Sequence, residues 1–226
     1  MKKIGLLSGL LILLFTVSFK PKAKVFEGTI KYVVDHHVEY GVIKYPQELS
    51  VSIKGDLIRI DIPLPFAEMS HIIDCKKGSS VKLCTVDGIK YCVKTDLKKS
   101  VTMEKVAMAK DSSKIINDLK CAFGRIHTKD SHCTIYSTEK YVISKTITDC
   151  GLELPYRLFY SQKEFEGKLI VQQDVFDNDG QTTYLVESVT ESQLKESYVS
   201  PPVVDHTEVT EEALGKIIRN YVKSAR

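Results

Sequence analysis

The sequence predicts a mainly β protein of the α+β class, and three observations lead to that prediction. Residues 26–34 alternate between apolar and polar side chains, which is the pattern of a half-buried strand. Three tight-turn signals follow, each between runs that alternate in the same way. Residues 210–221 instead repeat their apolar side chains at helical spacing. These patterns are typical of an antiparallel sheet followed by a C-terminal helix.

The first hairpin is predicted at Gly55-Asp56. A two-residue turn at this position would place three apolar pairs on one face of the sheet: Ile53 with Ile58, Val51 with Ile60, and Leu49 with Ile62. The opposite face would then pair Ser52 with Arg59 and Ser50 with Asp61. Turn chemistry and apolar pattern therefore agree on a single register.

A second hairpin is predicted at Asp87-Gly88, which is a type I′ turn signal. This turn would pair Cys84 with Tyr91 and Leu83 with Cys92. Cys84 and Cys92 would then point to opposite faces of the sheet, where they cannot form a disulfide with each other. A three-residue bulged loop would change this parity and permit their approach.

A third hairpin is predicted around residues 177–180. Its strands would face each other through Leu169, Val171 and Val175 on one side and Thr182, Tyr184 and Val186 on the other. Asp177, Asp179 and Gly180 also match positions 3, 5 and 6 of a calcium-binding loop. Positions 1 and 12 of that loop fall on valines, which have no carboxylate, so a turn is favoured over a cation site.

Two stretches of the chain are expected to be helical. Residues 100–120 lose the strand alternation, and their apolar residues suit one or two short helices that would cover one end of the sheet. Near the C-terminus, Thr210 is a suitable N-cap for a helix that packs on the sheet. Its apolar stripe consists of Leu214, Ile217, Ile218 and Tyr221.

The N-terminus has the layout of a secretory signal peptide. Lys2 and Lys3 precede an uncharged run from Ile4 to Phe19, and lysines follow it. Residues 1–18 are predicted to be the signal peptide, with an uncleaved anchor as the alternative, and residues 25–226 to be a single β domain. No cysteine lies near the end of the apolar run, so N-terminal lipidation is not expected. We therefore expect a periplasmic or secreted protein of the cell envelope.

Six cysteines in an exported chain predict up to three disulfides, with the connectivity left open and buried free thiols as the alternative. They are Cys75, Cys84, Cys92, Cys121, Cys133 and Cys150. None belongs to a C-x-x-C pair, and their spacing does not suit the two close ligand pairs of a tetrahedral zinc site. No metal or other cofactor is predicted.

The remaining composition narrows the function classes. Lys+Arg 32 against Asp+Glu 29 gives a formal net charge of +3, which is too small for the basic surface that nucleic-acid binding requires. The sequence has no G-x-S-x-G, H-E-x-x-H, Walker A or G-x-G-x-x-G motif. Accordingly, no catalytic residue is assigned and an enzymatic role is not expected. The oligomeric state is left open.

Several segments resemble an uncharacterised family of exported bacterial envelope proteins. These are the opening strand Phe26 to Tyr32, the hairpin from Leu49 to Ile60, the turn at Asp87-Gly88, the segment Gly151 to Pro155, and Ser200-Pro201-Pro202 before the final helix. That family's architecture is similar to the lipoprotein carriers LolA and LolB, and the resemblance spans residues 25 to 223. It implies a strongly curved antiparallel sheet, or incomplete barrel, with one or two helices over its concave side.

The resemblance also implies an apolar cavity between sheet and helices, in which acyl chains could be sheltered from water. Its lining is predicted to comprise Tyr32, Leu49, Val51, Ile53, Ile58, Ile60 and Ile62, with a dry packed core as the alternative. The leading hypothesis is therefore a noncatalytic module that binds a lipid, lipoprotein or other hydrophobic ligand. The alternatives are an envelope structural or protein-interaction module with a filled core, and a secreted hydrolase without a recognisable motif.

Overall fold

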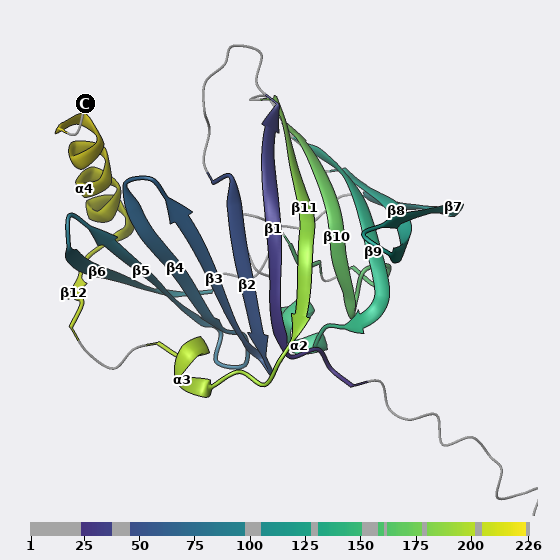
Figure 1. Ribbon diagram of the computed structural model, residues 1–226, viewed down its shortest axis with the longest axis horizontal. Helices are drawn as coiled ribbons and strands as arrows, with labels where there is room; N and C mark the ends of the chain where they lie inside the picture. Colours follow the sequence, from purple (N-terminus) through teal and green to yellow (C-terminus); the bar gives the residue numbers. More distant parts are fainter. Residues whose placement is uncertain are drawn as a thin grey trace, which may run out of the picture.

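The computed structural model describes residues 24–37, 46–97, 105–127, 131–150, 158–160, 162–177, 180–201 and 205–224 of the chain. Within these ranges the chain forms one large, curved and open sheet of 12 strands with few helices (Figure 1). The strands are β1 Gly28–His37, β2 Glu48–Lys54, β3 Leu57–Leu64, β4 Ala67–Asp74, β5 Ser79–Val86, β6 Ile89–Asp96, β7 Lys105–Ile116, β8 Leu119–His127, β9 His132–Val142, β10 Lys168–Asp177, β11 Gly180–Glu191 and β12 Thr207–Glu208. The helices are α2 Lys145–Asp149, α3 Glu196–Val199 and α4 Glu211–Ser224. The predicted mainly β class, with a curved sheet and a C-terminal helix, is confirmed.

Two meanders make up the sheet, whose strand order is β12-β6-β5-β4-β3-β2-β1-β11-β10-β9-β8-β7. Strands β1–β6 form the N-terminal meander and β7–β11 form the C-terminal meander. They lie on either side of the central β1–β11 pair, which is antiparallel along the whole of β1 (Figure 1). The two-residue β12 adds to β6 in parallel. No helix in the described ranges is long and apolar enough to cross a bilayer.

The predicted hairpin registers are present in the N-terminal meander. Ile53 lies opposite Ile58 and Val51 opposite Ile60, as the turn at Gly55 requires. The second turn pairs Cys84 with Tyr91 and Leu83 with Cys92, so Cys84 and Cys92 face opposite sides of the sheet. Gly55, Asp87 and Gly88 all have positive φ, as expected of hairpin turns whose twist matches that of the strands. Both register predictions are therefore confirmed.

In the third hairpin, β10 and β11 pair in an antiparallel register that sets Val175 opposite Thr182 and Gln173 opposite Tyr184. The pairing reaches Asp177 and Gly180 at the end next to the turn. The tip of the turn itself, residues 178–179, lies outside the described residues.

The prediction of helices within residues 100–120 is wrong for the part of this stretch that the structure describes. Residues 105–116 form strand β7, which turns at Asn117 and Asp118 into β8. Both turn residues have positive φ, +47° and +61°. Asn and Asp tolerate this left-handed backbone better than other non-glycine residues. Asn117-Asp118 is therefore a hairpin signal, although the apolar spacing of the residues around it suits a helix.

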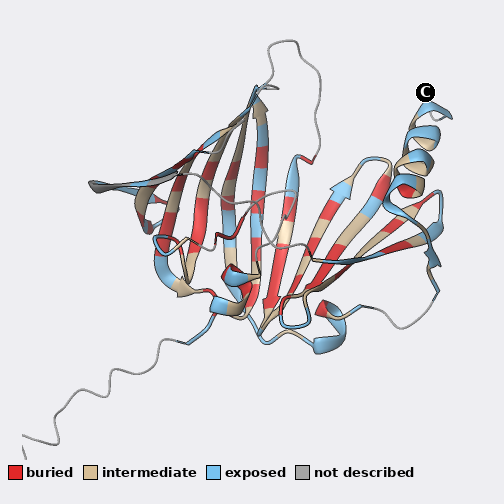
Figure 2. Ribbon diagram, turned by 180° about the vertical axis from the view of Figure 1, so that it is seen from behind, coloured by how far each residue is buried: buried red, intermediate tan, exposed pale blue. Residues whose placement is uncertain are grey.

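The main core lies on one face of the central strands. Along β1 and β3, buried residues alternate with more exposed ones, and Figure 2 shows this banding across the sheet. The buried face is covered by Ile147 from α2 and by Leu158 and Phe159 from the segment that follows. The cover over this face therefore includes side chains that lie outside any strand.

Helix α4 forms a separate cluster with the outer strands of the N-terminal meander. The Thr210 hydroxyl accepts a hydrogen bond from the Ala213 amide at 3.2 Å, so the predicted N-cap is confirmed. Leu214 is buried against residues of β4, β5 and β6, namely Ala67, Cys84, Val86 and Val93. Lys82 of β5 donates to the Glu211 carboxylate at 2.6 Å. The predicted packing of this helix on the sheet is confirmed.

His71 of β4 lies on the face of the sheet that packs against α4, beside the Lys82–Glu211 ion pair. The residue is 6% exposed, and within the described ranges neither ring nitrogen has a hydrogen-bond partner. Burial, with a smaller contribution from the Lys82 charge, lowers the pKa of His71 from 6.5 to about 4, and Glu211 opposes the shift. The imidazole is therefore neutral at physiological pH.

Shortening a side chain of the main core is expected to lower the free energy of unfolding substantially. Ile58→Ala should lower the free energy of unfolding by about 2–5 kcal/mol, because Ile58 is fully buried and the vacated space cannot fully collapse. Ile115→Ala on β7 is the matched control, since that side chain is 73% exposed and should cost less than about 1 kcal/mol. Urea unfolding of both variants measures the difference. Equal losses would contradict the described burial.

Acidification is expected to destabilise the fold between pH 6.5 and pH 4. In this window the unfolded chain binds a proton at His71 that the folded chain does not, so the free energy of unfolding falls as the pH falls. His71→Phe should flatten the slope by up to about 1.4 kcal/mol per pH unit. Urea unfolding across this pH range measures the slope, with the exposed His37→Phe as the control. An unchanged slope in His71→Phe would exclude this account.

Candidate functional site

The seven residues predicted to line an apolar cavity do lie together in the structure. Tyr32, Leu49, Val51, Ile53, Ile58, Ile60 and Ile62 all belong to the main core cluster on β1, β2 and β3. Water can touch at most 3% of any of them, whether from outside or from within a cavity. They pack against one another and against the covering segment. Their role as ligand lining therefore stays a prediction, and a ligand that reached them would have to displace part of the cover.

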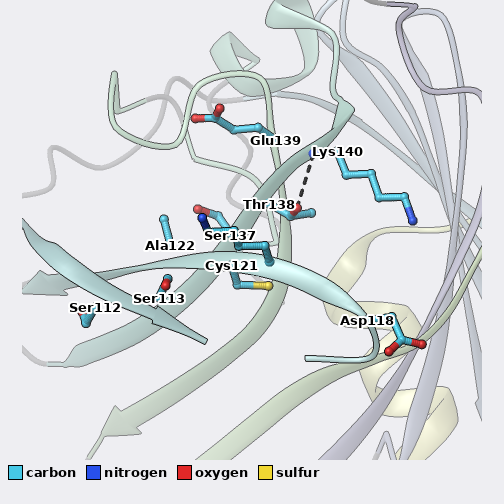
Figure 3. A pocket seen from close by; sticks show the side chains of 10 residues that line it. Ser112, Ser113, Asp118, Cys121, Ala122, Ser137, Thr138, Glu139 and Lys140 are labelled. Carbon is cyan, nitrogen blue, oxygen red and sulfur yellow. Dashed lines mark hydrogen bonds between the residues drawn. The ribbon is translucent and has the colours of Figure 1, made fainter. Parts of the chain in front are cut away.

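A solvent-open pocket of about 720 Å³ lies on the C-terminal meander (Figure 3). Strands β7, β8 and β9 and the β7–β8 turn form its walls. Its lining consists of Ser112, Ser113, Asp118, Lys120, Cys121, Ala122, Ser137, Thr138, Glu139 and Lys140. Eight of these ten side chains carry a hydroxyl, carboxylate or amino group, and we refer to this site as the polar pocket.

Three small side chains of the pocket lining follow one another across three strands. Ser113 of β7 lies opposite Ala122 of β8, and Ala122 lies opposite Ser137 of β9. Side chains in such a cross-strand row share one face of the sheet. Leucine or phenylalanine at these places would fill the space that the short side chains leave open. The row thus forms the floor of the pocket.

Charged groups of both signs surround this floor. Asp118 comes from the β7–β8 turn, Lys120 from β8, and Glu139 and Lys140 from β9. All four are exposed, and their formal charges cancel. The Glu139 carboxylate also pairs with Lys168 of β10 at 3.0 Å. The pocket therefore offers hydrogen-bond donors and acceptors without a strong net field.

The nucleophile candidates in this pocket are not activated. Cys121 is fully buried, burial raises the pKa of its thiol, and the sulfur donates to the Leu119 carbonyl at 3.3 Å. Such a thiol is a poor nucleophile, because the reactive species is the thiolate. Within the described part of the chain, none of the three serine hydroxyls in the lining is hydrogen-bonded to a histidine or carboxylate that could act as a base.

No group of three or more His, Cys, Asp or Glu side chains is arranged to hold a metal ion among the residues that the structure describes. Five of the six cysteines are buried, and Cys150 is half-buried. His127 and His132 stack on each other at 6.1 Å between ring centroids, next to Phe176. These three side chains lie near the ends of β8, β9 and β10. Among the described residues, the two histidines belong to no group that could hold a metal ion.

Sequence reasoning did not identify the polar pocket. Its floor depends on which residues of β7, β8 and β9 lie opposite one another, and the predicted helices in residues 100–120 removed β7 from the sheet. The Asn117-Asp118 turn is the signal that would have restored it, because a two-residue turn there places Ser113 opposite Ala122.

Comparisons with known proteins provide a fold neighbour and no family. No protein-family model matches the chain, and no curated protein is similar to it in sequence. Two solved structures of PNGF-II, in space groups C2 and P21, are similar to it with a TM-score of 0.53 each at 10% identity. They cover 87% of this chain but 33% and 34% of PNGF-II, so the chain spans about a third of that protein's length. At this identity the likeness concerns the fold alone, and the resemblance to the LolA and LolB carriers stays a prediction.

Proposed function

We propose that this chain is an exported, noncatalytic binding module whose ligand occupies the polar pocket on β7, β8 and β9. The observation that carries the proposal is the pocket itself, which has a volume of about 720 Å³ and lies within the usual size range of small-molecule sites. Its walls are hydrogen-bonded strands of one sheet. Walls of this kind hold their side chains in fixed positions, as a binding site needs.

The lining favours a small polar ligand. Asp118 and Lys120 would have to be desolvated beneath an apolar molecule, which is unfavourable for unpaired charges. A molecule with several hydroxyl or amide groups would instead form hydrogen bonds with these residues and with Ser113. Export is part of the proposal because of the signal-like segment, which lies outside the described residues.

A second candidate is the binding of a lipid, lipoprotein or other hydrophobic ligand over the N-terminal meander. The observation that favours it is the continuous apolar face of β1, β2 and β3, which Ile147, Leu158 and Phe159 cover from outside the sheet. Such a cover can move without breaking a strand ladder. An acyl chain would then take the place of the covering side chains.

The polar pocket can be closed by one substitution. Ala122→Phe should fill it, because Ala122 lies in the middle of the small-residue row. Native mass spectrometry of protein purified from the cells that make it is expected to show a noncovalent polar adduct, reduced about tenfold in Ala122→Phe. Ala107→Phe, at an exposed position on the same strand pair, is the matched control and should keep the adduct. An adduct that survives in folded Ala122→Phe would rule out this pocket as its site.

The hydrophobic candidate predicts a different response. Saturable binding of a fluorescent hexadecanoic acid analogue is expected to tighten several-fold in Phe159→Ala, because less of the cover must be displaced. Exposed Ile115→Ala should bind as the unaltered chain does. Absence of saturable binding by all three proteins would eliminate this candidate. If native mass spectrometry also gave a clean mass without adduct, a protein-interaction module with a filled core would be favoured.

A further inference from the structure

The side chains of Cys75 and Cys150 interact directly through their sulfur atoms, although 75 positions separate them in the sequence. Cys75 follows β4 at the start of the turn to β5, and Cys150 is the C-cap of α2. Cys75 is buried in the main core cluster, and half-buried Cys150 packs against the same cluster. Both are free thiols in this structure.

Contacts that do not involve the thiols hold the two segments together. Asp56, in the turn between β2 and β3, accepts a hydrogen bond from the Cys75 amide on its backbone carbonyl at 3.0 Å. Its carboxylate accepts a second one from the Ser144 hydroxyl at the start of α2, at 2.9 Å. One residue therefore fixes both the end of β4 and the beginning of α2. These contacts hold the end of β4 next to the start of α2, the helix that ends at Cys150.

The other four cysteines are not placed to pair with each other along the ladders. Cys84 and Cys92 sit on adjacent strands but face opposite sides of the sheet. Cys121 and Cys133 are also on adjacent strands, where Cys133 lies opposite Ile126, five positions from Cys121. Five strand residues span roughly 16 Å, whereas disulfide-bonded residues have Cα atoms within about 7 Å of each other.

The two thiols differ in reactivity. The neighbouring Cys150 side chain, together with burial, raises the pKa of Cys75, whereas the Cys75 side chain lowers the pKa of Cys150. Cys150 is also the more exposed of the two. Cys150 is therefore the sulfur that an incoming reagent meets first, and the one with more thiolate character.

We propose that Cys75 and Cys150 form a disulfide by exchange with an external disulfide. The Cys150 thiolate attacks one sulfur of the donor, forms a mixed disulfide and releases the first donor thiolate. Cys75, having lost its proton to solvent, then attacks the Cys150 sulfur and releases the second donor thiolate. The two cysteines are oxidised by two electrons, and the donor disulfide is reduced to two thiols.

The cross-link would join parts of the fold that are remote in sequence. Cys75 belongs to the N-terminal meander, whereas α2 follows β9 of the C-terminal meander (Figure 1). The bond would therefore tie the two meanders together beyond the β1–β11 pair. It would also fix α2, whose Ile147 forms part of the cover over the main core.

Tryptic mapping tests this pairing directly, because each of the six cysteines falls in a different tryptic peptide. The folded chain is incubated with oxidised glutathione, blocked with N-ethylmaleimide under denaturing conditions and digested without reduction. We expect four maleimide adducts on the intact protein and one linked pair, residues 60–76 with residues 146–157. Six adducts, or a link between other cysteines, would overturn the proposal.

Single variants and a thermal readout complete the test. Cys75→Ser and Cys150→Ser should each lose the linked pair and keep five blockable thiols, while Cys84→Ser should keep the link and leave three. Oxidation should raise the melting temperature by about 5–15 °C, as expected for closing a loop of this length in a chain of this size. The Cys75→Ser/Cys150→Ser double variant should show no such rise, and a rise of equal size in it would overturn the proposal. Neither readout depends on ligand binding, so failure here leaves the proposed binding function untouched.

Discussion

The antiparallel pairing of β1 with β11 is the interaction on which the rest of the structure depends. Each meander is built from hairpins between neighbouring strands, and this pair joins the two into one sheet. The ladder connects residues about 150 positions apart, so its formation carries a large loop-closure cost that local hairpins avoid. Gly28 at its start shows how closely the strands approach, since a Cβ there would lie 2.1 Å from the Thr190 carbonyl oxygen. Only glycine fits this position without moving the backbone.

A register shift interrupts the same pair next to two hydrogen bonds with the C-terminal meander. The shift falls between Lys31 and Tyr32, and next to it the Val186 carbonyl accepts a hydrogen bond from the Asn117 side chain. The β7–β8 turn is thereby anchored to the central pair. The Tyr32 hydroxyl, buried in the core, donates to the Ile170 carbonyl at 2.9 Å, and burial raises the pKa of that hydroxyl. One irregular position in β1 is thus linked to both β10 and the walls of the polar pocket.

Local chemistry explains which parts of the fold could be predicted from the sequence. Gly55-Asp56 and Asp87-Gly88 specify both a turn and a register, because two-residue turns leave only one pairing that keeps apolar residues on one face. The β1–β11 pairing has no such local signal, since nothing in residues 28–37 specifies residues 180–191 as the partner. Residues 100–120, which include β7, are predicted to be helical because they lose the strand alternation, although apolar spacing in a short segment fits both periods. The polar pocket depends on that strand and was missed with it.

The position of the seven predicted lining residues sets a physical condition for any hydrophobic ligand. Tyr32, Val51 and their neighbours are already buried, so contact with a ligand removes no further apolar surface of these residues from water. The favourable free energy comes only from burial of the ligand's own apolar surface. It must also offset the exposure of Ile147, Leu158 and Phe159, at about 1.5–3 kcal/mol for each side chain. With about 0.8 kcal/mol for each buried methylene, the exchange becomes favourable only beyond roughly six to eleven methylene groups. A long acyl chain meets this condition and a short one does not, whereas the polar pocket, already open, sets no such threshold.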